Sequence, residues 1–257
     1  MKCRLIISDN YNPFFNMAFD YYFWQKCIDK KNLPVLRFYK WNPSSVSTGY
    51  NQKKESLINL EFCEENKIPI VMRPTGGSAI FHDIEITYSF CANTSHHTFF
   101  SSPFSSYIIL CKGIIKGIEK KGINFKIRGF SEGEEPSFTD IPCFSLSSRH
   151  DIVYNDKKVI GSAQRRNNFS FLQHGSILID IRKDLWENIF IKEVDFSKIG
   201  CLKDIISDID EKELMRFLKE GFEEVLSFSI FEDQLKKEEI EEIKIIEEKL
   251  KKEGKYE

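Results

Sequence analysis

The amino-acid sequence predicts an α/β (α+β) fold in which a largely antiparallel, partly open sheet is flanked by helices. Three patterns lead to this prediction. Amphipathic helical segments lie between short apolar runs of strand character, two probable hairpins occupy the second half of the chain, and the pattern from about Asp208 to the end is helical. A chain of 257 residues is long enough for one large core, or for a main domain with a small appendage.

The first half of the chain is expected to alternate helices with strands. After a short N-terminal strand, Asn12-Pro13 marks a helix entry, and aromatic residues at helical spacing predict a core helix over 14–28. A second amphipathic helix is expected to begin at Phe104. Between and around these helices, strands are predicted over residues 36–41, 45–49, 68–72 and 85–90.

The second half is expected to contain a long loop, two hairpins and a helical end. Residues 129–150 have no clear periodicity, which is typical of a functional or mobile loop. The first hairpin turns at Asn155-Asp156, and the second turns at Asn167-Asn168 before a strand over 171–180. The charged amphipathic pattern over 235–250 favours a solvated helix over a small helical subdomain, rather than a helix that binds a partner.

Composition excludes several classes of function. Charged residues make up 30% of the chain and the net charge is −2, so no broad basic field is available for nucleic acid or an anionic membrane. No apolar run suits a signal peptide or a membrane span, which predicts a cytoplasmic protein. The seven cysteines form no Cys-x-x-Cys pair, so neither disulfides nor a zinc site is expected, and most should be buried.

A glycine-rich segment, Arg73–Asp83, follows directly after an apolar strand. Gly76 and Gly77 would let the backbone pass close to a ligand and present its N–H groups to an anion or a carbonyl oxygen. Taken alone, paired glycines between strands are more typical of a tight turn than of a ligand loop. His82 alone is more typical of a structural histidine than of an acid or base.

Two further segments carry polar groups on predicted strands. In Lys158–Ala163 a lysine precedes the small residues Gly161, Ser162 and Ala163. Small residues let a substrate lie flat on a sheet, and a fixed ammonium can hold a carbonyl or phosphate oxygen. Taken alone, Lys157 and Lys158 are more typical of two exposed charges on a hairpin than of a binding site. The segment Gln173–Ser176, which contains His174, is ambiguous in the same way.

Together, the three segments resemble the biotin and lipoate protein ligase superfamily in order and spacing. Arg73–Asp83, followed by Thr87-Tyr88-Ser89, is similar to the superfamily's glycine motif. Lys158–Ala163 is similar to its Lys-x-x-Gly-Ser-Ala motif, and Gln173–Ser176 to its Gln-His-Gly-Ser motif. The resemblance runs from about residue 10 to about residue 180.

The N-terminal blocks 16–20 and 36–41 also look like those of the superfamily. The resemblance implies the biotin/lipoate ligase catalytic-domain fold over residues 1–204 and a small C-terminal helical subdomain over 205–257. It implies an acyl chain held in an apolar tunnel under the glycine loop. The residues it implies for substrate binding are Arg73, Gly76, Gly77, His82, Gly161, Ser162, Ala163 and His174.

Within the superfamily, the chain looks most like the octanoyltransferases of the LipM type. His82–Ser89 and Ala163–Arg166 resemble that class, and Pro142-Cys143-Phe144 lies in the long loop where that class has its Cys-Phe pair. This resemblance implies that Cys143 is the nucleophile. Lys158 would then stabilise the oxyanion and, through its charge, lower the pKa of the thiol.

The implied reaction is octanoyl transfer in lipoate biosynthesis, without cofactor, ATP or metal. A thiolate would take the octanoyl group from octanoyl-acyl carrier protein and pass it to a lysine of a lipoyl-domain protein such as glycine-cleavage H protein. Two departures keep other readings open: Ser145–Ser148 replaces an Asp-Ser-Pro-Ser-like run, and Ser78 stands where an arginine is frequent. The alternatives are an ATP-dependent lipoate-protein ligase, with or without a separate accessory chain, and a non-catalytic acyl- or cofactor-binding protein.

Overall fold

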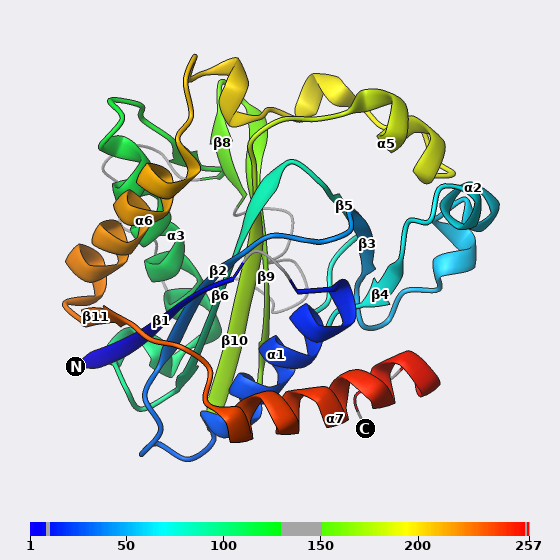
Figure 1. Cartoon of the computed structure of the whole chain (residues 1–257). Coiled ribbons are helices and arrows are strands. Elements are labelled where there is room, and N and C mark those ends of the chain that lie inside the picture. Colours follow the sequence, from blue (N-terminus) through cyan, green and yellow to red (C-terminus); the bar gives the residue numbers. More distant parts are fainter. Residues whose placement is uncertain (9–10, 130–150, 255, 257) are drawn as a thin grey trace.

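The structure is a computed structural model that describes residues 1–8, 11–129, 151–254 and 256. Its main layer is an eight-stranded sheet in the order β11-β1-β2-β6-β10-β9-β8-β7, and a three-stranded sheet, β4-β3-β5, lies on one side of it (Figure 1). The strands of the main sheet are β1 (Lys2–Ser8), β2 (Val35–Tyr39), β6 (Glu85–Asn93), β7 (Lys126–Ile127), β8 (Ile152–Tyr154), β9 (Lys157–Arg166), β10 (Ser170–Leu178) and β11 (Ser229–Glu232). Those of the small sheet are β3 (Ser45–Thr48), β4 (Ile70–Met72) and β5 (Ile80–His82).

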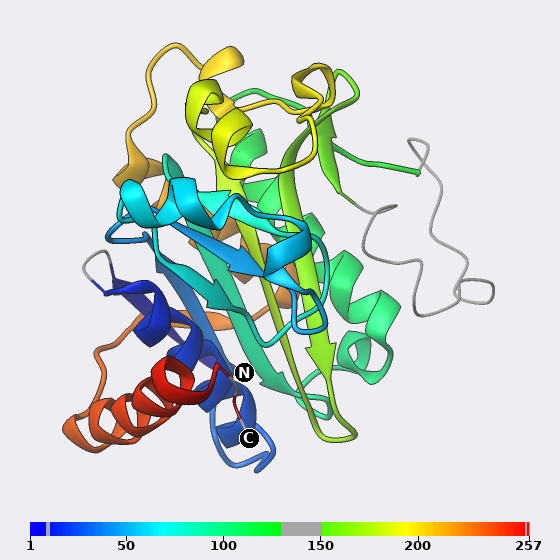
Figure 2. The same ribbon diagram turned by 90° about the vertical axis from the view of Figure 1, so that its right-hand side faces the viewer.

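Helices cover both faces of the main sheet. One hydrophobic core joins one face to α3 and α6, and a second joins the other face to α1 and α7 (Figures 1 and 2). A third core lies between the small sheet, α2 and α5. The helices are α1 (Pro13–Lys26), α2 (Leu60–Glu65), α3 (Pro103–Glu119), α5 (Lys183–Ile189), α6 (Glu211–Leu226) and α7 (Lys237–Glu253). Short 3₁₀ turns are η1 (Lys54–Ser56), η2 (Thr98–Ser101), η4 (Phe196–Lys198) and η5 (Leu202–Asp204).

The structure confirms that the main sheet is largely antiparallel and that both predicted hairpins form. Within the described residues, five of the seven pairings in the main sheet are antiparallel, and the two parallel pairings join β11, β1 and β2 at one edge. Asn155 and Asp156, between β8 and β9, have φ of 47° and 62°. Two left-handed residues make the turn whose twist suits a two-residue hairpin, which is why this dipeptide predicted it.

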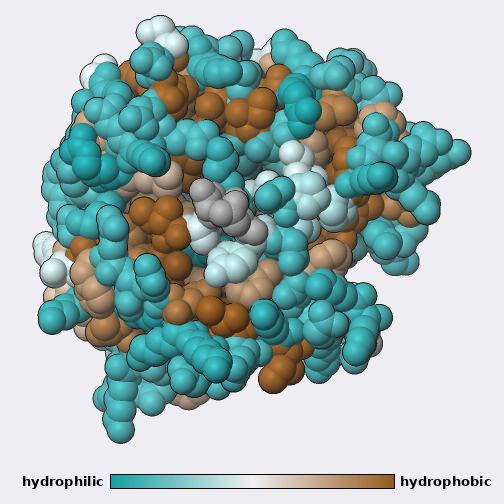
Figure 3. All heavy atoms as spheres, viewed as in Figure 1, coloured by the Kyte–Doolittle hydropathy of each residue, from teal (hydrophilic) through white to brown (hydrophobic). Residues whose placement is uncertain are grey.

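The predicted helix entries are confirmed by their capping contacts. The Asn12 side chain accepts hydrogen bonds from the N–H groups of Phe14 and Phe15, while Pro13 occupies the first helical position of α1. Ser102 caps α3 in the same way, ahead of Pro103. Most of the outer surface in the view of Figure 1 is hydrophilic, with apolar residues in scattered groups (Figure 3).

The expectation of an uninterrupted helical pattern after Asp208 is wrong at β11. The helix α6 ends at Leu226, its C-cap residue Ser227 has a φ of 53°, and β11 then pairs in parallel with β1. Four residues are too few to establish a periodicity in sequence, and the free edge of β1 decides their conformation. Because α6 and β11 share a core with earlier elements, they extend the main fold; the division of the chain at residue 204 stays a prediction.

Two other predictions, the long loop over 129–150 and the cytoplasmic location, are not tested by the described residues. Apart from Gly129, the predicted loop over 129–150 lies outside the described residues. Among the residues that are described, no helix combines the length and apolar character that a membrane crossing requires. The cytoplasmic location stays a prediction.

The contact between α3 and α6 gives a test of the packing. A Cβ added at Gly221 would lie 2.3 Å from the carbonyl oxygen of Gly113 and 2.4 Å from the nitrogen of Gly117. We expect Gly221→Ala to lower the free energy of unfolding by about 1–3 kcal/mol, because backbone atoms cannot yield as a side chain can. Urea unfolding measures the change. Glu224→Ala, on the exposed side of α6, should stay within about 0.5 kcal/mol of wild type, and an equal effect of both variants would contradict the close approach.

Candidate active site

A pocket of about 300 Å³ lies between the middle strands of the main sheet and the small sheet. Eight of the residues predicted to bind substrate or to act in catalysis line it: Arg73, Gly77, His82, Lys158, Gly161, Ser162, Ala163 and His174. Its remaining lining is mostly apolar, including Met17, Trp41, Val159 and Leu178. Gly76 is not part of the lining, and Cys143 lies outside the described residues.

The register of β10 explains how motifs far apart in sequence meet at this pocket. β10 pairs with β6 on one side and with β9 on the other, so that Ser176 lies opposite both Thr87 and Gly161. His174, two residues earlier, projects from the same face. The pocket therefore forms where β9, which carries Lys158, runs beside β10, which carries His174.

Arg73 fixes the shape of the glycine loop, residues 73–79. Its guanidinium donates two hydrogen bonds to the Gly76 carbonyl, at 2.7 and 3.2 Å, and one to the Ser78 carbonyl at 2.8 Å. Two more, each 3.2 Å, reach the carbonyl and hydroxyl oxygens of Ser47. All five N–H groups are thus engaged with the protein. Burial lowers the pKa of Arg73 to about 10, so the side chain is still charged at neutral pH. The predicted contact of Arg73 with substrate stays a prediction.

Two glycines allow this loop to close. Gly77 has a φ of +94°, which L side chains rarely adopt, and a Cβ there would lie 2.9 Å from Arg73 Nη2. A Cβ at Gly49, after β3, would lie 2.2 Å from the Gly77 carbonyl oxygen. The role of Gly49 was missed in the sequence, where a single glycine at a strand end carries no specific signal.

His82 is held between a carboxylate and a hydroxyl. Its Nδ1 lies 2.9 Å from Glu85 Oε1 and its Nε2 lies 2.7 Å from Ser47 Oγ. The ring stacks on Trp41 with centroids 3.9 Å apart and an interplanar angle of 9°. The buried Glu85 also accepts hydrogen bonds from the hydroxyls of Thr87 and Ser176. Both residues lie in the recognised motifs but were not among the predicted site residues.

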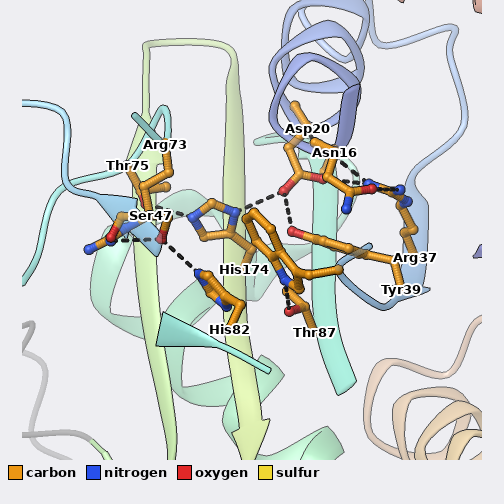
Figure 4. Close-up of polar contacts among 12 residues, drawn as sticks. Asn16, Asp20, Arg37, Tyr39, Ser47, Arg73, Thr75, His82, Thr87 and His174 are labelled. Carbon is orange, nitrogen blue, oxygen red and sulfur yellow. Dashed lines mark hydrogen bonds and ion pairs between the residues drawn. The ribbon is translucent and has the colours of Figure 1, made fainter. Parts of the chain in front are cut away.

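His174 is held in the same manner (Figure 4). Its Nδ1 lies 2.8 Å from Asp20 Oδ2 and its Nε2 lies 2.6 Å from Thr75 Oγ1. Tyr39 donates to the same Asp20 oxygen at 3.1 Å.

Sequence reasoning missed Asp20, Thr75, Ser47 and Glu85 as site residues. Asp20, Thr75 and Glu85 do fall within blocks that resemble the superfamily or its LipM-type class, and this was the one signal available for them.

Lys158 forms an ion pair at the pocket wall. Its Nζ lies 2.9 Å from Asp151 Oδ1, and the Asp151 side chain is 5% exposed against 40% for Lys158. A Cβ at Gly161 would lie 2.5 Å from Cε and 2.8 Å from Nζ of Lys158. The space above this glycine is thus filled by the lysine side chain rather than left open for a flat substrate. The Ser162 hydroxyl accepts a hydrogen bond from Tyr88 at 2.7 Å.

The six cysteines that the structure describes are all buried, as expected for free cysteines. Burial raises the pKa of Cys27 to about 12 and raises the pKa of Cys91 and Cys111 as well. A thiol is a nucleophile only as the thiolate, so these buried thiols are unsuited to the role.

Comparison with known proteins identifies the family. The model of the lipoyl protein ligase A/B catalytic domain matches residues 12–223. The chain belongs to this family. Its relatives include proteins described as octanoyltransferase LipM from several bacteria. That of Bacillus subtilis (strain 168) is 33% identical over 256 residues, covering 93% of this chain and 91% of the relative. That of Brevibacillus brevis is 37% identical over 186 residues, covering 71% and 67%.

Solved structures of lipoyl protein ligases share the fold. A crystal structure of lipoate-protein ligase A bound with ATP matches with a TM-score of 0.82 at 22% identity, covering 97% of this chain and 95% of that one. A T. acidophilum protein with bound lipoic acid matches with a TM-score of 0.80 at 21% identity, covering 97% and 96%. At these identities the likeness establishes the catalytic-domain fold alone, which confirms the predicted fold class.

The buried His174 gives this family member a testable dependence of stability on pH. Burial lowers the pKa of His174, although the hydrogen bond to Asp20 opposes the shift. Below about pH 6.5 the unfolded chain binds a proton that folded His174 does not bind, so the free energy of unfolding falls as the pH falls, by up to about 1.4 kcal/mol per pH unit. Urea unfolding at pH 7.5 to 5.5 should show a steeper fall for wild type than for His174→Asn. Equal slopes would contradict a neutral His174.

Proposed function

We propose that this chain is an octanoyltransferase that moves an octanoyl group from octanoyl-acyl carrier protein to a lysine of a lipoyl-domain protein. The observation that carries the proposal is a fixed ammonium, Lys158 Nζ, on the wall of a largely apolar pocket. An apolar pocket suits an alkyl chain, and a cation at its wall suits the carbonyl at the end of that chain. The activity named for the sequence relatives agrees with this chemistry.

The first step would be acyl transfer to Cys143. The thiolate attacks the thioester carbonyl, the carbonyl oxygen gains negative charge, and the bond to the carrier sulfur then breaks. The carrier leaves as a thiolate and takes up a proton from solvent. Lys158 would stabilise the oxyanion, and Asp151 would hold the ammonium in place. The loop residue Cys143 lies outside the described residues, so its role rests on its resemblance to the Cys-Phe pair of the class.

The second step would form the product amide. The neutral amine of the acceptor lysine attacks the Cys143 thioester, the thiolate of Cys143 leaves, and the proton of the amine is released to solvent. An amide is more stable than a thioester, so the transfer needs no ATP. A lipoyl-domain protein is the acceptor that the family implies, and glycine-cleavage H protein is the acceptor that we propose for the test.

The acyl-enzyme gives the first test. After incubation with octanoyl-acyl carrier protein and no ATP, intact-mass spectrometry should find one octanoyl group on the wild-type chain, and peptide mapping should locate it on Cys143. Cys143→Ala should abolish both the adduct and the transfer to H protein, whereas Cys63→Ala should keep both, because Cys63 is buried in the third core. Modification of H protein that requires ATP and survives Cys143→Ala would instead establish a lipoate ligase. Tight binding of octanoate without any modified acceptor would establish a non-catalytic binding protein.

The placement of Lys158 gives the second test. In Gly161→Ala the new methyl group would occupy the space of Lys158 Cε and Nζ, so this flexible side chain would swing away from Asp151. We expect the rate of octanoyl transfer to fall on the order of 10²-fold. The free energy of unfolding should fall by about 1–3 kcal/mol, because the buried carboxylate of Asp151 loses its partner. Single-turnover kinetics and urea unfolding measure the two quantities. A stable variant with the wild-type rate would show that the position of Lys158 does not matter.

A further inference from the structure

The two histidines of the pocket have all four ring nitrogens engaged in hydrogen bonds with the protein. We propose that His174 and His82 are positioning residues that connect buried carboxylates to the glycine loop and hold this loop over the pocket. The inference deepens the proposed function, because it concerns the loop that would cover the acyl group. It assigns neither histidine a proton transfer in the reaction.

The first connection runs from α1 through β10 to the loop. Asp20 is fully buried, and its Oδ2 faces both the Tyr39 hydroxyl and His174 Nδ1. Arg37 Nη1 lies 3.6 Å from the other oxygen of Asp20, so the carboxylate has a cation beside it. An ionised carboxylate only accepts hydrogen bonds, so Nδ1 of His174 must carry the proton. Its Nε2 is then an acceptor, and Thr75 of the loop donates to it (Figure 4).

The second connection runs from β6 through β5 and β3 to the same loop. Ser47 Oγ accepts a hydrogen bond from Arg73 Nη1, so its own proton is available for His82 Nε2. His82 Nδ1 then donates to Glu85. Because Arg73 also binds the carbonyls of Gly76 and Ser78, this chain of hydrogen bonds ends on the loop one and three residues beyond Thr75.

These two chains constrain what the imidazoles can do. A ring nitrogen of either histidine could accept or deliver a proton only if a hydrogen bond to Thr75, Ser47 or a buried carboxylate were broken first. A buried polar atom that loses its partner is costly, so the hydrogen-bonded arrangement is strongly favoured. The rings therefore form part of the pocket wall, with the ring of His82 stacked on Trp41.

The experiment compares Thr75→Val with Thr75→Ser, because valine removes only the hydroxyl at nearly the same shape. Thr75→Val should speed hydrogen–deuterium exchange of the loop amides, residues 75–79, by about tenfold, and should raise KM for octanoyl-acyl carrier protein by a similar factor, with kcat within about threefold of wild type. Thr75→Ser should restore both quantities. The exposed Thr98→Val serves as the matched control and should change neither.

A companion variant tests the second chain. Ser47→Ala should also speed exchange of the loop amides, and the double variant Thr75→Val with Ser47→Ala should speed it by less than the product of the two single effects, because both chains hold one loop. Unchanged loop exchange in Thr75→Val, or equal exchange in Thr75→Val and Thr75→Ser, would overturn the proposal. Exchange needs no turnover, so this result is separate from any failure of the wild-type chain to form an octanoyl adduct.

Discussion

The buried carboxylate of Asp20 is the constraint on which the arrangement of the site depends. A charge taken out of water is costly unless cations and hydrogen-bond donors replace the water. Here the guanidinium of Arg37 lies beside it, held between the rings of Phe19 and Tyr39 at 4.0 and 3.9 Å from their centroids. Asp20 lies on α1. Its partners Arg37 and Tyr39 come from β2, and its third partner, His174, comes from β10. Satisfying one carboxylate therefore fixes a helix and two strands relative to one another.

The buried carboxylate of Glu85 fixes the small sheet relative to the main sheet in a similar way. It begins β6 in the main sheet, whereas His82 ends β5 in the small one. The hydrogen bond between them joins the two sheets at the edge of the pocket, and the one that Ser47 donates to His82 links β3 to β5 within the small sheet. The glycine loop leaves β4 and enters β5, so its position follows from the docking of this sheet. The fold thus secures the loop through buried polar groups as well as through apolar packing.

How far the sequence predicts this structure depends on the range of the contacts involved. The turn at Asn155-Asp156 was predictable because a two-residue preference decides it. The meeting of the lysine and histidine segments followed from the resemblance to the superfamily. The partners of His174 could not be predicted, because Thr75 and Asp20 are 99 and 154 residues away in sequence and no local pattern links them. The strand β11 was missed for the same reason, since its partner is the first strand of the chain.

A pocket for an alkyl chain that also handles a carbonyl must combine an apolar interior with a localised charge. In this structure the polar atoms of His82 and His174 face hydroxyls and carboxylates of the protein, which makes the rings compatible with an apolar wall. The ammonium of Lys158 comes from β9, and its side chain is partly exposed. Since Gly161 leaves room for this side chain and Asp151 binds its end, the cation is fixed before any substrate arrives. Such preorganisation is what makes a single charge effective, because no energy is spent on orienting it during the reaction.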